Sequence, residues 1–110
     1  MIFDILGTTT IISQETTDLT VFIKNLNANY SKIEHDNLIV NLFSFSKLTP
    51  NDILEFLEVS NKHRNTKKSF VIVTAVVSYD DVPEELIVVP TIQEAKDVIE
   101  MEEIERDLGF

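Results

Sequence analysis

The sequence predicts an α/β fold: one domain over residues 1–110, with a mixed sheet of about five strands and helices packed on it. Two observations carry this prediction. Short β-branched runs alternate with stretches whose apolar residues recur at helical spacing. A chain of 110 residues with 44% hydrophobic and 25% charged residues also suits a single core. The expected order is strand, strand, helix, strand, helix, strand, strand, helix.

The first third of the chain predicts a hairpin followed by a helix. Residues 2–6 and 8–13 have strand composition, and Gly7 separates them. Thr17 is a candidate N-cap for a helix over residues 18–33. Apolar residues follow at steps of three and four, at Leu19, Phe22, Ile23, Leu26, Tyr30 and Ile33.

The middle of the chain predicts a strand, a helix and a second strand. Residues 38–43 are almost continuously apolar, which indicates a strand covered on both faces. Thr49 as cap and Pro50 at the first position predict a helix that ends in the basic residues 62–68. Residues 70–77 are β-branched and uncharged, so we expect the longest central strand there.

The last third predicts a polar connector, a short strand and a long helix. Residues 80–85 are acidic, and residues 86–89 read as a strand closed by Pro90. Thr91 and Glu94 have the spacing of a capping box. The helix that follows ends near Gly109, with its expected apolar side at Ile92, Ala95, Val98, Ile99, Met101, Ile104 and Leu108.

Composition excludes several function classes. Without Cys there is no disulfide, thiol nucleophile or Cys-ligated zinc. No apolar run approaches the roughly 18 residues of a membrane span, and the start lacks the features of a signal peptide. The net charge of −10 repels phosphate backbones. We therefore expect a cytoplasmic protein that binds no nucleic acid and no membrane.

Residue types that act in catalysis in known enzymes are present in this sequence, but they do not form a recognisable catalytic motif. Ser44 and Ser46 lack a Gly-x-Ser-x-Gly elbow, and the adjacent His35 and Asp36 lack a third partner. Two glycines cannot make a phosphate-binding loop. We expect a protein that is not an enzyme, with no catalytic residues, no cofactor and no metal site.

The order and lengths of these segments resemble the STAS domain, the fold of anti-sigma-factor antagonists. The resemblance rests on the strand from Leu38, the capped helix from Thr49, and the strands and helix over residues 70–77, 86–89 and 91–95. It implies a regulatory protein–protein interaction module. In the family, an Asp-Ser-Ser-Gly-like motif carries a serine that a partner kinase phosphorylates. Here Asn51 takes the serine position and Asp52 the glycine position, so the usual phosphorylatable serine is missing.

The resemblance implies a partner-binding face around residues 44–52, formed by Phe45, Thr49, Asn51 and Asp52. Thr49 is the hydroxyl left in this turn, and we expect it to act as an N-cap rather than as a phosphorylation site. Two orientations are open for Phe45. It either projects as an aromatic anchor for a partner or turns into the core.

The C-terminal helix suggests a second partner-binding surface at Glu102, Glu103, Arg106 and Phe110. Acidic residues near a helix C-terminus oppose the helix dipole, by about 0.3–1 kcal/mol each. Two explanations are open for how the helix tolerates this unfavourable interaction. Either the packing of Ile104 and Leu108 is sufficient to offset it, or residues 102–110 dock on a basic partner or on the basic residues 62–68 of another copy. We therefore expect this surface to bind another protein or, alternatively, a second copy of the chain in a homo-oligomer.

The C-terminal half also resembles small flavobacterial proteins described as ribonuclease Z. The similar stretches are residues 87–95 and 101–110. That nuclease needs a His-x-His-x-Asp-His metal motif, whereas this chain has only His35 and His63. The alternative function is therefore an accessory or partner of an RNA-processing nuclease, not the metal-dependent nuclease itself.

Overall fold

The computed structural model describes residues 1–15 and 18–109, and its centre is one five-stranded mixed sheet. The strands neighbour one another in chain order. The first pair is antiparallel and the other three pairs are parallel. The predicted α/β fold is therefore confirmed. The strands are β1 (Ile2–Leu6), β2 (Thr9–Ser13), β3 (Asn37–Asn41), β4 (Phe70–Val73) and β5 (Ile87–Val89).

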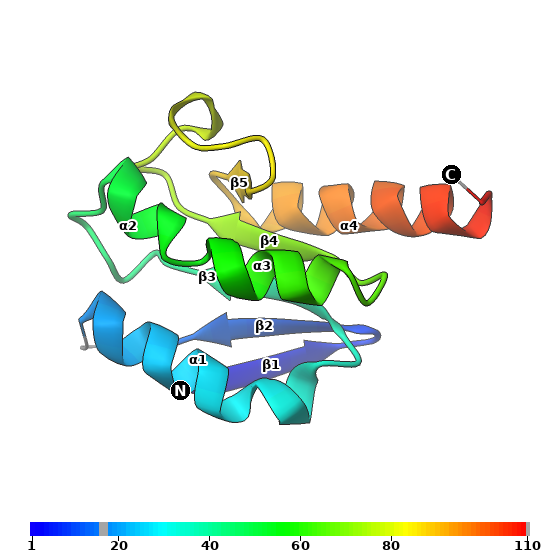
Figure 1. Ribbon diagram of the computed structural model, residues 1–110, viewed down its shortest axis with the longest axis horizontal. Helices are drawn as coiled ribbons and strands as arrows, with labels where there is room; N and C mark the ends of the chain where they lie inside the picture. The colour runs from blue at the N-terminus through cyan, green and yellow to red at the C-terminus, as the bar shows by residue number, and fades with distance from the viewer. Residues whose placement is uncertain (16–17, 110) are drawn as a thin grey trace.

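Helices cover the two faces of the sheet unequally, as Figure 1 shows. One face carries the larger core, to which α1 and α3 contribute, and the other face carries a smaller core with α4. None of the helices within the described residues is long and apolar enough to span a membrane. The helices are α1 (Leu19–Ile33), α2 (Pro50–Leu54), α3 (Leu57–Arg64) and α4 (Ile92–Asp107), with a short 3₁₀ helix η1 (Tyr79–Asp81) before β5.

The N-terminal hairpin and α1 form as the sequence predicts. Gly7 connects β1 to β2 with a φ of +62°, which lies in the left-handed region that glycine adopts freely. The N-cap of α1 is Asp18, whose carboxylate accepts a hydrogen bond from the Val21 N–H at 2.8 Å. The cap is thus one residue later than expected, and Thr17 itself lies outside the described residues.

The predicted single helix after Thr49 is two helices, α2 and α3. The N–H groups of Glu55 and Phe56 donate to the carbonyls three residues earlier, at 3.3 and 3.0 Å, which tightens the turn. Ile53 and Phe56, on either side of this turn, are both fully buried. The expectation of one continuous helix was wrong because the chain tightens at Glu55 and Phe56, and α3 begins anew at Leu57.

The strand predicted over residues 70–77 ends at Val73. β5 pairs only with Val71–Val73, and β3 reaches no further along β4. The Thr74 hydroxyl then accepts a hydrogen bond from the Val76 N–H at 3.2 Å, so the chain turns. The β-branched composition of residues 70–77 still indicates core residues beyond the end of β4, because Val77 is buried.

Helix α4 begins as predicted, but its apolar side is shorter than expected. The Thr91 hydroxyl accepts a hydrogen bond from the Glu94 N–H at 3.1 Å. Ala95 and Ile99 are buried against the sheet. The later apolar residues Met101, Ile104 and Leu108 are instead exposed. The polar side chains of Glu102 and Arg106 occupy the sheet-facing side there.

Candidate partner-binding site

The carboxyl ends of β3 and β4 meet at one edge of the sheet. The Leu42 N–H donates to the Val73 carbonyl at 2.9 Å, so residues 43–49 and 74–79 leave neighbouring strands side by side. In α/β sheets the crevice outside the carboxyl ends of the strands is the usual binding position. We call this region the carboxyl edge.

Three apolar side chains are exposed in the segments that leave the carboxyl edge. Phe43 is 54% exposed, Val76 51% and Tyr79 68%. Side-chain hydrogen bonds fix the turns that hold them outside: Asn41 accepts from the Phe43 N–H at 3.1 Å, and Thr74 accepts from the Val76 N–H. Val76 and Tyr79 also line a hollow of about 460 Å³ with Thr74, Asp81 and Val89. The edge therefore presents apolar surface to solvent.

Phe45 adopts the inward one of its two expected orientations. It is half-buried against the larger core, and its ring meets the Phe22 ring edge to face at 5.7 Å. The neighbouring Ser44 hydroxyl donates to the Gln14 carbonyl at 2.8 Å. Phe43, which lies in the strand predicted over residues 38–43, is instead exposed. No alternation of apolar and polar residues marks it, because β3 is buried on both faces; Phe43 is exposed because β3 ends at Asn41.

Thr49, Asn51 and Asp52 form the first turn of α2 at the same edge. The Thr49 hydroxyl accepts from the Asp52 N–H at 3.3 Å, and the Asp52 carboxylate accepts from the Thr49 N–H at 2.9 Å. This reciprocal pair is a capping box, and it confirms the expected N-cap role of Thr49. Thr49 and Asn51 are exposed and Asp52 is half-buried.

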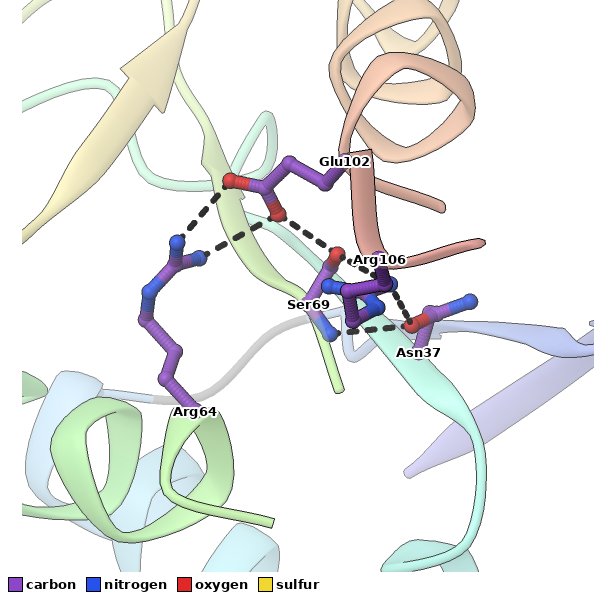
Figure 2. Close-up of polar contacts among 5 residues, drawn as sticks. All are labelled: Asn37, Arg64, Ser69, Glu102 and Arg106. Atoms are coloured by element: carbon purple, nitrogen blue, oxygen red, sulfur yellow. Dashed lines mark hydrogen bonds and ion pairs between the residues drawn. The ribbon is translucent and has the colours of Figure 1, made fainter. Parts of the chain in front are cut away.

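The opposite edge of the sheet holds a network of polar side chains, drawn in Figure 2. Glu102 of α4 lies between Arg64 of α3 and Ser69, the residue before β4. Arg64 donates to both carboxylate oxygens, from Nη2 at 2.9 Å and from Nη1 at 3.4 Å. The Ser69 hydroxyl donates to Oε1 of Glu102 at 2.5 Å. One carboxylate thus ties α4 to α3 and to the start of β4.

Arg106 extends the same network toward β3. Its Nη2 donates to the Ser69 hydroxyl at 3.2 Å and to Oδ1 of Asn37 at 3.4 Å. Oδ1 of Asn37 also accepts from the Ser69 N–H at 2.9 Å. Asn37 and Ser69 are fully buried, so these bonds satisfy side-chain oxygens that water cannot reach, whereas Nδ2 of Asn37 has no hydrogen-bond partner within the described residues. We call Asn37, Arg64, Ser69, Glu102 and Arg106 the amino-edge network.

The network holds Glu102 as a carboxylate. Burial alone raises the pKa of this side chain, because a desolvated charge is unfavourable. Hydrogen bonds from Arg64 and Ser69, with the positive charges of Arg64 and Arg106, outweigh that effect and bring the pKa below its usual value. The Glu102 side chain is 17% exposed, so this charge depends on its protein partners.

The structure therefore uses Glu102 and Arg106 within the chain. Glu102 meets a basic residue of its own 62–68 segment, and this contact opposes the unfavourable effect of acids near the α4 C-terminus. The expectation that packing of Ile104 and Leu108 is sufficient was wrong, since both are exposed. Glu103 is half-buried and accepts from the Thr8 hydroxyl at 3.4 Å. Phe110 lies outside the described residues.

His63 is fully buried, although its position among the basic residues 62–68 suggests an exposed side chain. Nε2 lies 2.8 Å from the Asp36 carbonyl, and Nδ1 lies 2.8 Å from the Tyr30 hydroxyl. Because a carbonyl only accepts, Nε2 carries the proton of the neutral ring and Nδ1 accepts from Tyr30. Burial lowers the pKa of His63, the hydrogen bond to the Asp36 carbonyl partly opposes this effect, and the charges of Lys68 and Arg64 lower the pKa further.

The two residues of the His35–Asp36 pair serve different neighbours. His35 is exposed, and its Nε2 lies 3.6 Å from the Glu34 carboxylate. Asp36 accepts from the buried Thr10 hydroxyl at 2.8 Å. Within residues 1–15 and 18–109, no three His, Asp or Glu side chains gather in a way that would hold a metal ion.

The predicted partner-binding residues thus divide between two places. Phe45, Thr49, Asn51 and Asp52 lie at or behind the carboxyl edge, whereas Glu102 and Arg106 lie in the amino-edge network. No model of a known protein family matches this sequence, and no curated protein matches it either.

Proposed function

We propose that the protein is a non-enzymatic regulatory module of the cytoplasm that binds another protein at its carboxyl edge. The observation that supports this proposal is Phe43, an aromatic side chain 54% exposed at the end of a central strand. Aromatic residues are enriched among the anchors of protein interfaces, where burying them releases a large apolar area from water. Val76 and Tyr79, in the segment that leaves the neighbouring strand β4, are exposed apolar residues as well.

The polar groups of this edge favour recognition over chemistry. Ser44 and Thr49 make hydrogen bonds to the backbone, as does Asp52, and these bonds fix the loop and the first turn of α2. A rigid loop loses little conformational entropy when a partner binds. The edge is therefore suited to presenting Phe43 in one position to a complementary pocket.

The resemblance to the STAS domain favours the same edge. Residues 48–52 match the region of the phosphorylated motif, with Asn51 at the serine position. We propose an interaction like that of an anti-sigma-factor antagonist, without a phosphorylation switch at this position. Asp52, at the glycine position, places a carboxylate in the turn, where it is held by the Thr49 N–H.

The test is quantitative affinity purification at low salt from the cell that naturally produces the protein. Low salt preserves contacts of an acidic surface that screening would weaken. Three baits are compared: the unchanged chain, Phe43→Ser, and Ile5→Thr as a control. Ile5 is a 67% exposed apolar residue of the edge strand β1.

We expect a protein retained by the unchanged chain and by Ile5→Thr but lost with Phe43→Ser. Circular dichroism checks that all three baits are folded. Equal retention by Phe43→Ser would contradict the proposal. The identity of the retained protein separates a sigma-factor pathway from the alternative of an RNA-processing nuclease.

A further inference from the structure

One half of the sheet lacks a helix on the α4 side. α4 packs on β3, β4 and β5, and the described residues supply no second helix over β1 and β2 on that face. In Figure 1, α4 lies along β4 and β5, away from the β1–β2 hairpin. A sheet face beside a helix is a position where a second helix packs in layered α/β folds.

A groove runs between the hairpin and α4. Two adjoining hollows of about 540 and 470 Å³ share Leu6 of β1 and Lys96 of α4. Its apolar floor includes Ile2, which is 54% exposed, and Leu6, which is 43% exposed. We call it the β1–α4 groove, lined by Ile2, Leu6, Ile11, Ile92, Lys96 and Ile99.

Strand register explains why these side chains share one face. Asp4 pairs with Ile11, which belongs to the α4-side core. Side chains two residues apart point to the same face of a strand, so Ile2 and Leu6 flank Asp4 on that side. The groove is therefore the uncovered continuation of the α4-side core.

The charges around the groove are mainly negative. Asp4, Glu100 and Glu103 line it, with Lys96 as the positive neighbour. A second copy of this chain is a poor occupant, because the exposed apolar side of α4 is itself accompanied by acidic residues such as Glu105 and Asp107. Antiparallel pairing of two β1 strands in full register would also place Asp4 opposite Asp4.

We propose that the β1–α4 groove binds an amphipathic helix of a partner protein whose apolar face is flanked by Lys or Arg. The helix would lie beside α4 over the hairpin, with its apolar residues on Ile2 and Leu6 and its cations near Asp4, Glu100 and Glu103. Helix-in-groove recognition uses apolar anchors at i, i+3, i+4 and i+7 in this way. The groove borders the carboxyl edge at Asn41, which also accepts from the Phe43 N–H. Its floor residues Ile2 and Leu6 lie on β1, so variants there test this proposal apart from the proposed function.

The experiment is an NMR titration of the isotope-labelled chain at low salt with a synthetic Leu/Lys amphipathic peptide of about 18 residues, roughly 27 Å as a helix. A second peptide keeps every Leu and replaces Lys by Glu. We expect saturable shifts on the groove-facing residues of β1, β2 and α4 with the basic peptide, and none with the acidic one. Leu6→Gln should weaken binding at least about tenfold, or 1.4 kcal/mol, because it removes an apolar contact without changing the charge of the groove.

Two further variants keep the test decisive. Glu100→Lys should also weaken binding, since it removes a rim carboxylate without changing the floor. Ile5→Thr should bind as the unchanged chain does, because Ile5 points away from the groove. Shifts spread over all acidic surfaces, equal binding of both peptides, or unchanged affinity of Leu6→Gln would overturn the proposal. Sedimentation showing a dimer that Leu6→Gln dissociates would overturn it in favour of a second copy.

Discussion

The two edges of the sheet use their polar and apolar residues in opposite ways. At the amino edge, charged side chains are drawn inward, and Glu102 accepts from Arg64 and Ser69 in a largely buried network. At the carboxyl edge, side-chain hydrogen bonds satisfy the turns while Phe43 and Tyr79 project into solvent. At the amino edge, charged residues that the sequence suggests are solvent-exposed support the fold. At the carboxyl edge, Phe43, which the sequence suggests is buried, is exposed.

This difference separates stability from recognition. Residues of the amino-edge network connect α3, α4 and two strands, so changing them should alter the free energy of unfolding. The exposed carboxyl-edge side chains Phe43, Val76 and Tyr79 contribute little burial, so changing them should alter binding while the fold stays intact. The predictions below test this separation in order of decreasing effect on stability.

Glu102→Ala should have the largest effect. It leaves the Arg64 guanidinium and the buried Ser69 hydroxyl without their shared acceptor, and it removes the negative charge near Arg106. Breaking a fully buried pair costs about 3–5 kcal/mol, and partial exposure reduces this to about 2 kcal/mol here. Urea unfolding measures the loss. Glu105→Ala is the matched control on an exposed site of α4, expected within about 0.5 kcal/mol of the unchanged chain.

The free energy of unfolding should decrease in two separate pH ranges, or windows, as the pH is lowered. Burial lowers the pKa of His63 below 6.5, so the unfolded state binds protons first and stability declines as the pH falls below about 6.5. The pKa of Glu102 lies below 4.5, so a second loss follows as the pH falls through that region. Each group contributes a slope of at most about 1.4 kcal/mol per pH unit.

His63→Gln isolates the upper window. Gln retains an N–H donor for the Asp36 carbonyl but does not titrate, so the decline between pH 6.5 and 5 should flatten while the lower window remains. At pH 7 the variant should be less stable by about 1–2 kcal/mol, since Tyr30 loses its acceptor. A decline of unchanged slope would assign the upper window to another group.

Lys67→Gly should stabilise the protein slightly. Lys67 has a φ of +69°, the left-handed conformation that suits glycine after a helix. Removing its Cβ should add about 0.5–1 kcal/mol to the free energy of unfolding. A thermal unfolding midpoint at or below that of the unchanged chain would show that other interactions of the Lys67 side chain matter more.

Phe43→Ser should have the smallest effect on stability, within about 0.5 kcal/mol. The side chain is mostly exposed, and the turn depends on the bond from its N–H to Asn41, which the substitution retains. Chemical denaturation measures this value. A loss comparable to that of Glu102→Ala would mean that Phe43 supports the fold, and the contrast between the two edges would fail.

Much of the fold was predictable because local signals decide it. β-branched runs located all five strands, Gly7 marked the hairpin, and Thr49 and Thr91 marked helix starts. Boundaries were less predictable where a neighbouring element sets them. β4 ends at Val73 because its partners end there, and the helix after Thr49 breaks where the Glu55 and Phe56 N–H groups bond to carbonyls three residues earlier.

The site was less predictable because its decisive contacts are long-range. A glutamate such as Glu102 on an acidic helix looks solvated, and only the fold brings Arg64, 38 residues away, to it. His63 likewise looks exposed inside a basic run, yet it contacts Tyr30 and Asp36 from distant segments. Phe43 follows four buried residues and a strand end, so its exposure depends on where β3 stops.

The most direct test of the central claim is partner retention by Phe43→Ser measured alongside its stability. The account predicts a folded variant with an unfolding free energy close to that of the unchanged chain and with the partner lost, whereas Ile5→Thr keeps both. A folded Phe43→Ser chain that retains the partner at the same level would contradict the assignment of the carboxyl edge as the binding face.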